Sequence, residues 1–173
     1  MGATIEKFAG IMSLRLANAM LIPYDLNRYP NDLKTHFDNA EEKVRKLKPA
    51  FKGFAKTRQA IDDLSKAAAT ATKNLSNRLN DMRINSAEIE SLNRQLIALE
   101  KSFIDQKGMY YGDWFKSIYA SSDPFSGYAS WILPGIEYEL AIKRTNKLKE
   151  WDNRYAKAIA DLAQKMSKMS AKY

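Results

Sequence analysis

The chain has 173 residues, 45% apolar and 28% charged, so it is long and apolar enough to bury one core. It has no cysteine and one histidine, His36, which excludes disulfides, thiolate zinc sites, self-contained zinc-hydrolase sites and Ser or Cys hydrolase triads. The net charge of +8 raises nucleic acid or an anionic surface as partners. We therefore expect one domain with no catalytic residue, metal site or cofactor of its own.

The sequence contains no pattern typical of secretion or membrane insertion. Residues 2–4 lead directly into an amphipathic segment without a basic region and an apolar region of the signal-peptide type. The longest apolar stretches, such as residues 20–22 and 67–69, are far shorter than the roughly 20 residues that span a bilayer. We expect no signal peptide and no membrane contact by this segment, whereas the absence of cysteine leaves the compartment open.

Apolar residues spaced three or four apart predict two helices in the first fifty residues. The first helix is predicted to end before Pro23, and the second to begin near Pro30 and end before Pro49. The apolar residues of the first helix are Ile5, Phe8, Met12, Leu16 and Ala19. Those of the second are Leu33, Phe37, Ala40, Val44 and Leu47.

A long third helix is predicted from Ala50 to about Arg83, with apolar residues seven apart as in helical bundles. These are Phe54, Ile61, Ala68, Leu75 and Met82, with Leu64, Ala71 and Leu79 on the same side. Asn85 and Glu88 have the spacing of a capping box, which predicts the start of a fourth helix that ends near Asp105. Its apolar residues are Ile89, Leu92, Leu96, Leu99 and Phe103.

Residues 106–132 interrupt the helical pattern with four Gly or Pro residues among eight aromatic ones. A loop of this length is usually functional or disordered, and its aromatic content argues against disorder. A short helix is predicted over 136–142 and a last one over 148–169. The expected fold is all-α: an up-and-down four-helix-bundle-like domain with a long aromatic-rich loop and a short extra helix before the last helix.

Two basic runs are the best support for nucleic-acid binding, but a solvated helical face is the commoner meaning of such runs. The first comprises Lys43, Arg45, Lys46, Lys48, Lys52, Lys56 and Arg58. The second comprises Lys143, Arg144, Lys147, Lys149, Arg154, Lys157, Lys165, Lys168 and Lys172. We interpret both as solvated surface, and His36 as a rim or surface residue. Asp25 and Asp105 are interpreted as loop residues that accept hydrogen bonds from nearby backbone N–H groups.

Three motifs occur in order along the chain. Residues 16–25 read LANAMLIPYD, and residues 99–105 read LEKSFID. Residues 114–121 read WFKSIYAS and are followed by Gly127, Tyr128 and the sequence LPGI at 133–136. Taken together, these motifs resemble the transferrin receptor-like dimerisation domain, the C-terminal helical domain of the transferrin receptor and glutamate carboxypeptidase family.

The resemblance implies a bundle that packs against a second copy of itself within a larger enzyme. The catalytic domain, which lies N-terminal in this family, holds two zinc ions through His, Asp and Glu side chains. Residues 4–173 are then a single domain excised from a longer chain, and residues 1–3 were added by cloning. The compartment of the parent protein stays open, with export among the options.

The resemblance also implies a substrate-binding residue, Tyr128, in a loop that closes the parent enzyme's pocket. Tyr128 lies six residues before Pro134, as in the family, but the preceding residue is Gly127 rather than the Lys of the glutamate-preferring members. The other interpretation of Tyr128 is an aromatic residue packed within the loop. The other interpretation of the whole chain is a stand-alone basic helical bundle that binds nucleic acid or another protein.

Overall fold

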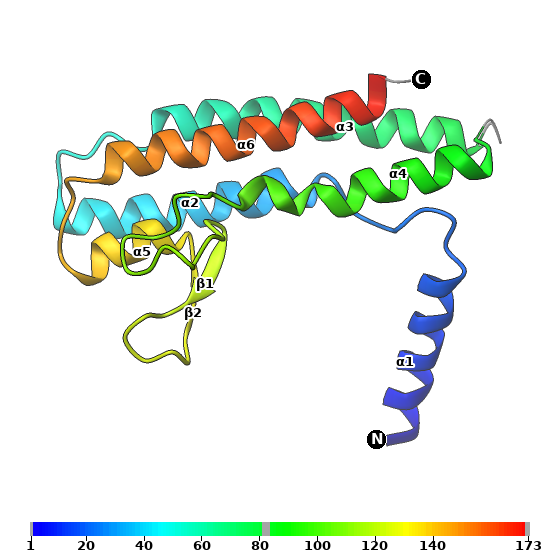
Figure 1. The fold of residues 1–173 in the computed structure, drawn as a ribbon, viewed down its shortest axis with the longest axis horizontal. Coiled ribbons are helices and arrows are strands. Elements are labelled where there is room, and N and C mark those ends of the chain that lie inside the picture. The colour runs from blue at the N-terminus through cyan, green and yellow to red at the C-terminus, as the bar shows by residue number, and fades with distance from the viewer. Residues whose placement is uncertain (1, 81–83, 172–173) are drawn as a thin grey trace.

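The computed structural model describes residues 2–80 and 84–171, with side chains described for 4–80 and 84–170. Its helices are α1 (Gly2–Ala17), α2 (Arg28–Leu47), α3 (Ala55–Asn80), α4 (Ser86–Ala98), the 3₁₀ helix η1 (Glu100–Phe103), α5 (Pro134–Ala141) and α6 (Leu148–Ala171). Helices α2, α3, α4 and α6 run alternately in opposite directions along one bundle (Figure 1). The predicted all-α, up-and-down fold is therefore confirmed.

The core lies between α3, α6 and α2, because each places its apolar stripe toward the others. Helices α3 and α6 share the most extensive contact of any pair of elements, and α2 packs against α3. Phe37 from α2, Phe54 before α3 and Tyr155 from α6 meet edge to face, with ring centroids 5.6 and 5.3 Å from Phe37. All three are fully buried, as the spacing predicts for the two phenylalanines, whereas Leu47 at the end of α2 is 43% exposed.

Helix α3 begins at Ala55 and not at Ala50 as predicted, because the chain turns sharply just before it. Gly53 has a φ of +99°, which helical residues do not adopt. The Phe54 N–H donates to the buried Glu41 carboxylate at 3.0 Å, and the Thr57 N–H donates to Asp152 of α6 at 2.9 Å. The predicted C-terminal residues Met82 and Arg83 lie outside the described residues.

The capping box predicted at the start of α4 is present. The Glu88 N–H donates to the Asn85 side chain, and the Asn85 N–H donates to the Glu88 carboxylate, both at 3.0 Å. The α-helix ends at Ala98, earlier than predicted, and η1 continues the path to the buried Phe103.

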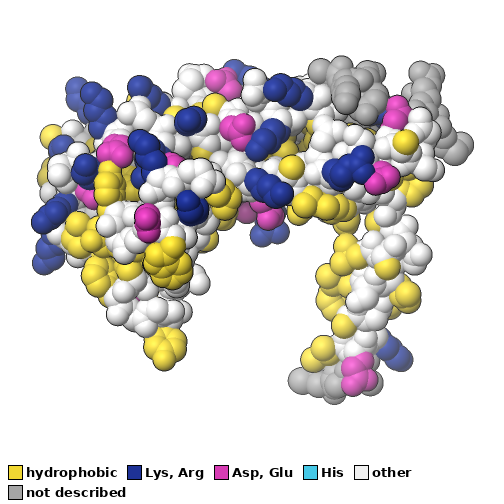
Figure 2. Space-filling view, in the orientation of Figure 1, with side chains coloured by type: hydrophobic (Ala, Val, Ile, Leu, Met, Phe, Trp, Pro, Cys, Tyr) yellow, Lys and Arg dark blue, Asp and Glu magenta, His cyan; other side chains and the backbone are white. Residues whose placement is uncertain are grey.

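The predicted first helix is present as α1, although it ends at Ala17 and leaves the predicted Ala19 outside, and its apolar stripe is not packed on the bundle. The helix projects away from the bundle (Figure 1), and its side chains are exposed to 66% at Ile5 and 65% at Phe8. Hydrophobic side chains are visible along it in Figure 2. The following segment runs beside α4, where the Asn93 side chain accepts from the Ile22 N–H and donates to the Met20 carbonyl, both at 2.9 Å.

The aromatic-rich loop contains a hairpin that the sequence analysis did not predict. Strands β1 (Ala120–Ser122) and β2 (Ser130–Ile132) pair in antiparallel register, with Ser121 opposite Trp131. The hairpin and α1 project from the same side of the bundle (Figure 1). Helix α5 starts two residues before the predicted Ile136 because Pro134 fits the first helical turn, and α6 is close to the prediction. No helix among residues 2–80 and 84–171 has the length and apolar character needed to cross a bilayer.

Candidate functional site

Tyr128 lies near the tip of the hairpin, and its side chain is 97% exposed. Its ring therefore does not pack on the described part of the chain, and the interpretation of Tyr128 as a packed loop aromatic is wrong for this structure. Figure 1 shows the hairpin tip as the part of this region farthest from the bundle. A phenol in this position is free to contact a neighbouring domain or a ligand.

The turn that carries Tyr128 is organised by Asp123. One carboxylate oxygen of Asp123 accepts from the Phe125 N–H at 2.7 Å, and the other accepts from the Ser126 hydroxyl at 2.6 Å. The Ser126 bond, followed by the backbone bond, lowers the pKa of the Asp123 carboxyl. Gly127 has a φ of +73°, a conformation that glycine adopts at little cost. Tyr128 is thus presented by a defined turn, and its side chain extends away from the part of the chain that the structure describes.

Aromatic rings brace the hairpin against α5. Tyr111 lies 5.0 Å from Tyr138 of α5 and 6.3 Å from Trp131 of β2, measured between ring centroids. Phe125 stacks on Tyr138 with centroids 6.2 Å apart, and the Tyr111 hydroxyl is 2.6 Å from the Ser121 hydroxyl of β1. The prediction that the loop is packed is therefore confirmed for its base.

The LPGI sequence joins the hairpin to α5. Leu133 has a φ of 55° and is buried, and its N–H donates to the Tyr119 carbonyl at 2.9 Å. A Cβ added at Gly135 would lie 2.5 Å from atoms of the Trp151 ring. Only glycine fits this contact, so the LPGI residues fix the hairpin relative to α6.

An ion pair holds the other side of the loop. The Arg154 guanidinium of α6 donates to the Asp105 carboxylate at 2.7 Å and to the Gly108 carbonyl, and it lies 4.2 Å from the centroid of the Trp151 ring. Burial raises the pKa of the Asp105 carboxyl, but bonds from the Lys107 N–H and Arg154 outweigh it and bring the pKa below its ordinary value. Asp105 and Asp25 both accept from backbone N–H groups two residues later, as predicted.

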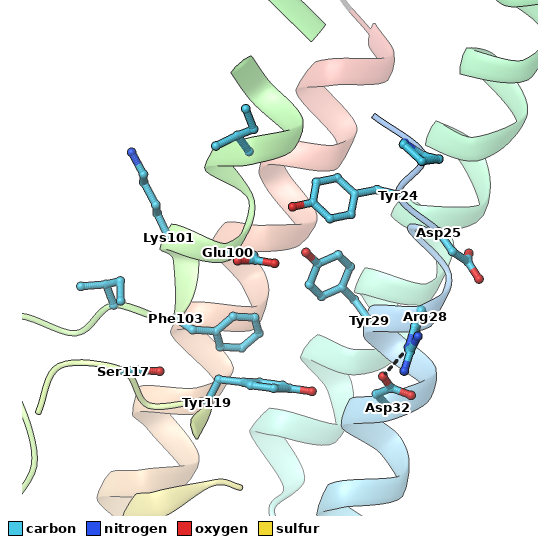
Figure 3. A pocket seen from close by; sticks show the side chains of 13 residues that line it. Tyr24, Asp25, Arg28, Tyr29, Asp32, Glu100, Lys101, Phe103, Ser117 and Tyr119 are labelled. Carbon is cyan, nitrogen blue, oxygen red and sulfur yellow. Dashed lines mark hydrogen bonds and ion pairs between the residues drawn. The ribbon is translucent and has the colours of Figure 1, made fainter. Parts of the chain in front are cut away.

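A groove of about 850 Å³ lies between the start of α2 and η1. Figure 3 shows Tyr24 and Tyr29 on one side and Glu100, Lys101 and Phe103 on the other. Burial, and then the nearby Glu100 carboxylate, raise the pKa of Tyr29 to about 12, so it stays a neutral phenol. The exposed apolar residues on its rim include Ile97 and Ile104.

The described residues offer no metal centre. No group of three His, Cys, Asp or Glu side chains in residues 2–80 and 84–171 is arranged to hold a metal ion. His36 is partly buried, with its ring centroid 5.9 Å from that of Tyr119, which agrees with its predicted place at a rim.

Sequence reasoning missed Arg154 and Asp123. Arg154 was counted in a solvated basic run, yet its side chain is only 8% exposed. Arg154 lies three residues after the buried Trp151 and four before the buried Ala158, and this spacing on the buried face of α6 is the signal that could have found it. Asp123, by contrast, precedes Pro124 and stands close to Gly127, a composition typical of a turn.

The chain is similar to three named plant proteins. It is 27% identical over 146 residues to the probable glutamate carboxypeptidase LAMP1 of Arabidopsis thaliana, covering 83% of this chain and 20% of that protein. It is 28% identical over 156 residues to the probable glutamate carboxypeptidase AMP1 of the same plant, covering 87% and 22%. For the probable glutamate carboxypeptidase VP8 of Zea mays, the identity is 26% over 157 residues, covering 88% and 21%. The chain thus spans about a fifth of the length of these relatives.

The family model for the transferrin receptor-like dimerisation domain matches residues 35–167. This range includes the LEKSFID, WFKSIYAS and LPGI sequences and begins after the LANAMLIPYD sequence. It also includes most of α2, all of α3, α4 and α5, the hairpin and most of α6. The chain therefore belongs to the transferrin receptor-like dimerisation domain family.

Proposed function

We propose that residues 4–173 are the homodimerisation domain of a longer, glutamate carboxypeptidase-like zinc peptidase, and that the hairpin contributes Tyr128 to the substrate pocket of that parent protein. The observation that carries the proposal is the exposure of Tyr128 on a braced hairpin in a domain of this family. The chain itself is not the catalytic part, and the catalytic domain belongs to the rest of the parent protein.

The zinc ions of the proposed parent do not fit this chain. The described residues hold no metal-binding group, and the whole sequence has one histidine. We therefore place the zinc ligands in the remaining four-fifths of the parent protein, and this domain contributes assembly and substrate contact.

The groove between α2 and η1 is the surface we assign to the homodimer. Its rim is apolar at Tyr24, Ile97 and Ile104, which are 38%, 54% and 46% exposed. It also carries charges of both signs, including Arg28 and Glu100. In a two-fold symmetric dimer, the same patch of one subunit packs on that patch of the other. A patch that carries both positive and negative charges can therefore place each charge opposite one of the other sign.

Tyr128 is suited to bind an anionic end of a peptide substrate. A phenol hydroxyl donates a hydrogen bond to a carboxylate, and such a charge-assisted bond contributes on the order of 1.5 to 3 kcal/mol. No cation directly precedes Tyr128, since residue 127 is glycine. Selectivity for a substrate that ends in glutamate is therefore not part of the proposal.

The pocket role is tested by Tyr128→Phe in the full-length parent enzyme. If the bond forms equally in the ground and transition states, KM rises about tenfold or more while kcat changes little. Tyr110→Phe is a matched control, because Tyr110 is an exposed phenol of the same loop that packs on Trp151. Unchanged kinetics for Tyr128→Phe, with the fold intact, would refute the pocket role.

The assembly role is tested by sedimentation of the full-length parent. We expect a dimer, which the double variant Ile97→Glu, Ile104→Glu weakens because it places charge in an apolar contact. Leu79→Glu is a control at an exposed leucine away from the groove. A monomeric parent protein would refute dimerisation, and an unchanged dimer in the double variant would move the interface elsewhere.

Nucleic-acid binding by the first basic run is less well supported. Lys43 pairs with Glu137 at 2.6 Å, Arg58 pairs with Asp38 at 2.7 Å and with Glu41 at 3.0 Å, and Arg45 and Lys46 also pair with α2 carboxylates. These ion pairs neutralise much of the charge of the first basic run, which the sequence analysis gives as support for nucleic-acid binding.

A further inference from the structure

Two segments at one end of the bundle, each a loop with the first residues of the helix that follows, carry seven cations, and Glu150 directly follows the second segment. Residues 47–56 contain Lys48, Lys52 and Lys56, and residues 142–149 contain Lys143, Arg144, Lys147 and Lys149. The first segment joins α2 to α3 and includes Lys56 in the first turn of α3, and the second joins α5 to α6 and includes Lys149 in the first turn of α6. We call the two segments together the basic end.

The two loops meet because the first turns of α3 and α6 are bonded to each other. The Asp152 carboxylate accepts from the Lys56 N–H at 3.3 Å and from the Thr57 N–H at 2.9 Å, and the Thr57 hydroxyl donates to the Asp152 carbonyl at 3.1 Å. Figure 1 shows both loops at the left end of the bundle, and Lys and Arg side chains gather at that end in Figure 2. Asp152 is therefore occupied with backbone donors of α3.

Six of the seven cations have no ion-pair partner among residues 2–80 and 84–171: Lys48, Lys52, Lys56, Lys143, Arg144 and Lys149. All six are exposed. The seventh, Lys147, lies 3.7 Å from the Glu150 carboxylate. The basic end thus differs from the side of α2 where Lys43, Arg45 and Lys46 are paired with carboxylates.

Lys143 occupies a backbone position that favours glycine. Its φ is 52°, and the N–H groups of Lys143 and Arg144 close the end of α5 by donating to the Leu140 and Glu139 carbonyls at 3.1 and 2.8 Å. Glycine is the usual residue at this point of such a helix end, because it has no Cβ to strain. Strained backbone conformations are concentrated at functional sites. The strain at Lys143 therefore supports a functional role for its positive charge.

The chemistry of the basic end fits a membrane surface better than a nucleic acid. Six of the seven cations are lysines, which act as flexible point charges, whereas planar arginines are favoured for recognising individual phosphates. Leu47 is 43% exposed beside these lysines, and neither groove described by the structure includes any of the seven cations. No aromatic ring of these loops is exposed for base stacking, since Phe51 and Phe54 pack on each other.

We propose that the basic end binds the surface of a membrane that contains anionic lipids. The lysines would lie at the headgroups, with Leu47 and Ala50 at the interface. Such binding needs no membrane-spanning segment, so it departs from the expectation of no membrane contact, which rested on the lack of one. The proposal does not depend on dimerisation or on Tyr128.

The test is co-sedimentation of the 173-residue chain with vesicles of phosphatidylcholine alone or with added phosphatidylserine, at low and high salt. We expect binding only to the anionic vesicles, weakened by salt. Lys48→Gln, Lys52→Gln, Lys149→Gln should lower partitioning on the order of 100-fold, because each lysine near such a surface contributes roughly fivefold. The control variant Lys7→Gln, Lys73→Gln, Lys168→Gln removes the same charge from exposed sites outside the basic end and should lose much less.

Lys143→Gly separates binding from folding. Glycine suits the φ of position 143, so this variant should keep its urea midpoint while vesicle partitioning falls several-fold. If vesicle partitioning falls equally in the two triple variants, binding depends only on the net charge of the chain, and the proposal is overturned. Binding to single-stranded DNA without binding to anionic vesicles, or binding to neither, would also overturn it.

Discussion

Position 135 shows how one residue fixes the join between the hairpin and the bundle. A Cβ at Gly135 would lie 2.5 Å from the fully buried Trp151 ring, so the ring or the start of α5 would have to move. We expect Gly135→Ala to lower the free energy of unfolding by about 1–3 kcal/mol, the range for overpacked cores. The measurement is urea unfolding followed by tryptophan fluorescence.

Gly10→Ala is the control for this substitution. A Cβ at Gly10 meets nothing within 4 Å, and alanine favours a helix interior more than glycine does. This variant should keep the midpoint or raise it slightly. A Gly135→Ala protein as stable as the original would show that the Trp151 ring moves aside at little cost.

Individual residues were the hardest features to predict from the sequence. Tyr128 and Tyr111 belong to the same aromatic-rich segment, yet Tyr111 packs among rings and Tyr128 is 97% exposed. Composition does not separate them, because the difference arises from a turn set by Asp123. The family resemblance singled out Tyr128 by its distance from the LPGI sequence, and local physics did not.

Helices were predicted well where a stripe of large apolar side chains faces one core, as in α2 and α6. The start of α3 was placed five residues early, because Phe54 belongs to the core without belonging to the helix. The hairpin was missed because its strands have three residues each and are rich in serine. The exposure of the α1 stripe was missed because a pattern shows which face is apolar and not what covers it.

The hydrogen bonds that join α6 to the first turn of α3 through Asp152 should contribute to stability. Asp152→Ala removes the acceptor for two N–H groups in the first turn of α3. We expect it to lower the free energy of unfolding by about 1–3 kcal/mol, because donors are left without a partner. Asn85→Ala, which removes an exposed capping box, should cost about 1 kcal/mol. A thermal or urea melt of both variants checks the order, and a larger loss in Asn85→Ala would contradict it.

The whole molecule should lose stability in acid. Burial raises the pKa of the Asp105 and Glu41 carboxyls, but hydrogen bonds from Lys107 and Arg154, and from Arg58 and Phe54, bring each pKa below its ordinary value. A carboxyl whose pKa is lower in the folded state than in the unfolded state stabilises the fold at any pH above its unfolded-state pKa. This stabilisation is lost as the pH falls through the folded-state pKa. Urea titrations should therefore show a declining free energy of unfolding below the ordinary values of 3.8 and 4.5.

Two variants separate the contributions to this pH dependence. Asp105→Asn should lower stability by about 1.5–3 kcal/mol at neutral pH, since it leaves the buried Arg154 without its anionic partner, and should flatten the acid decline. Glu139 contributes to the pH dependence with the opposite sign. Burial raises the pKa of its carboxyl, so ionisation of Glu139 lowers the free energy of unfolding as pH rises. Glu139→Gln should thus keep or raise stability at neutral pH. If the free energy of unfolding of Asp105→Asn falls at low pH as steeply as that of the original protein, the pH dependence arises from other carboxylates.

The pairing of α3 with the last helix has a consequence for how the domain is made. The first half of the core is synthesised long before α6, since the bonded residues Thr57 and Asp152 are 95 positions apart. During translation the part of the α3 apolar stripe that contacts α6 stays uncovered until α6 leaves the ribosome. Contacts of such long range slow folding and expose the nascent chain to aggregation. We expect a chain truncated before Leu148 to require chaperones and to fail to reach the native state on its own.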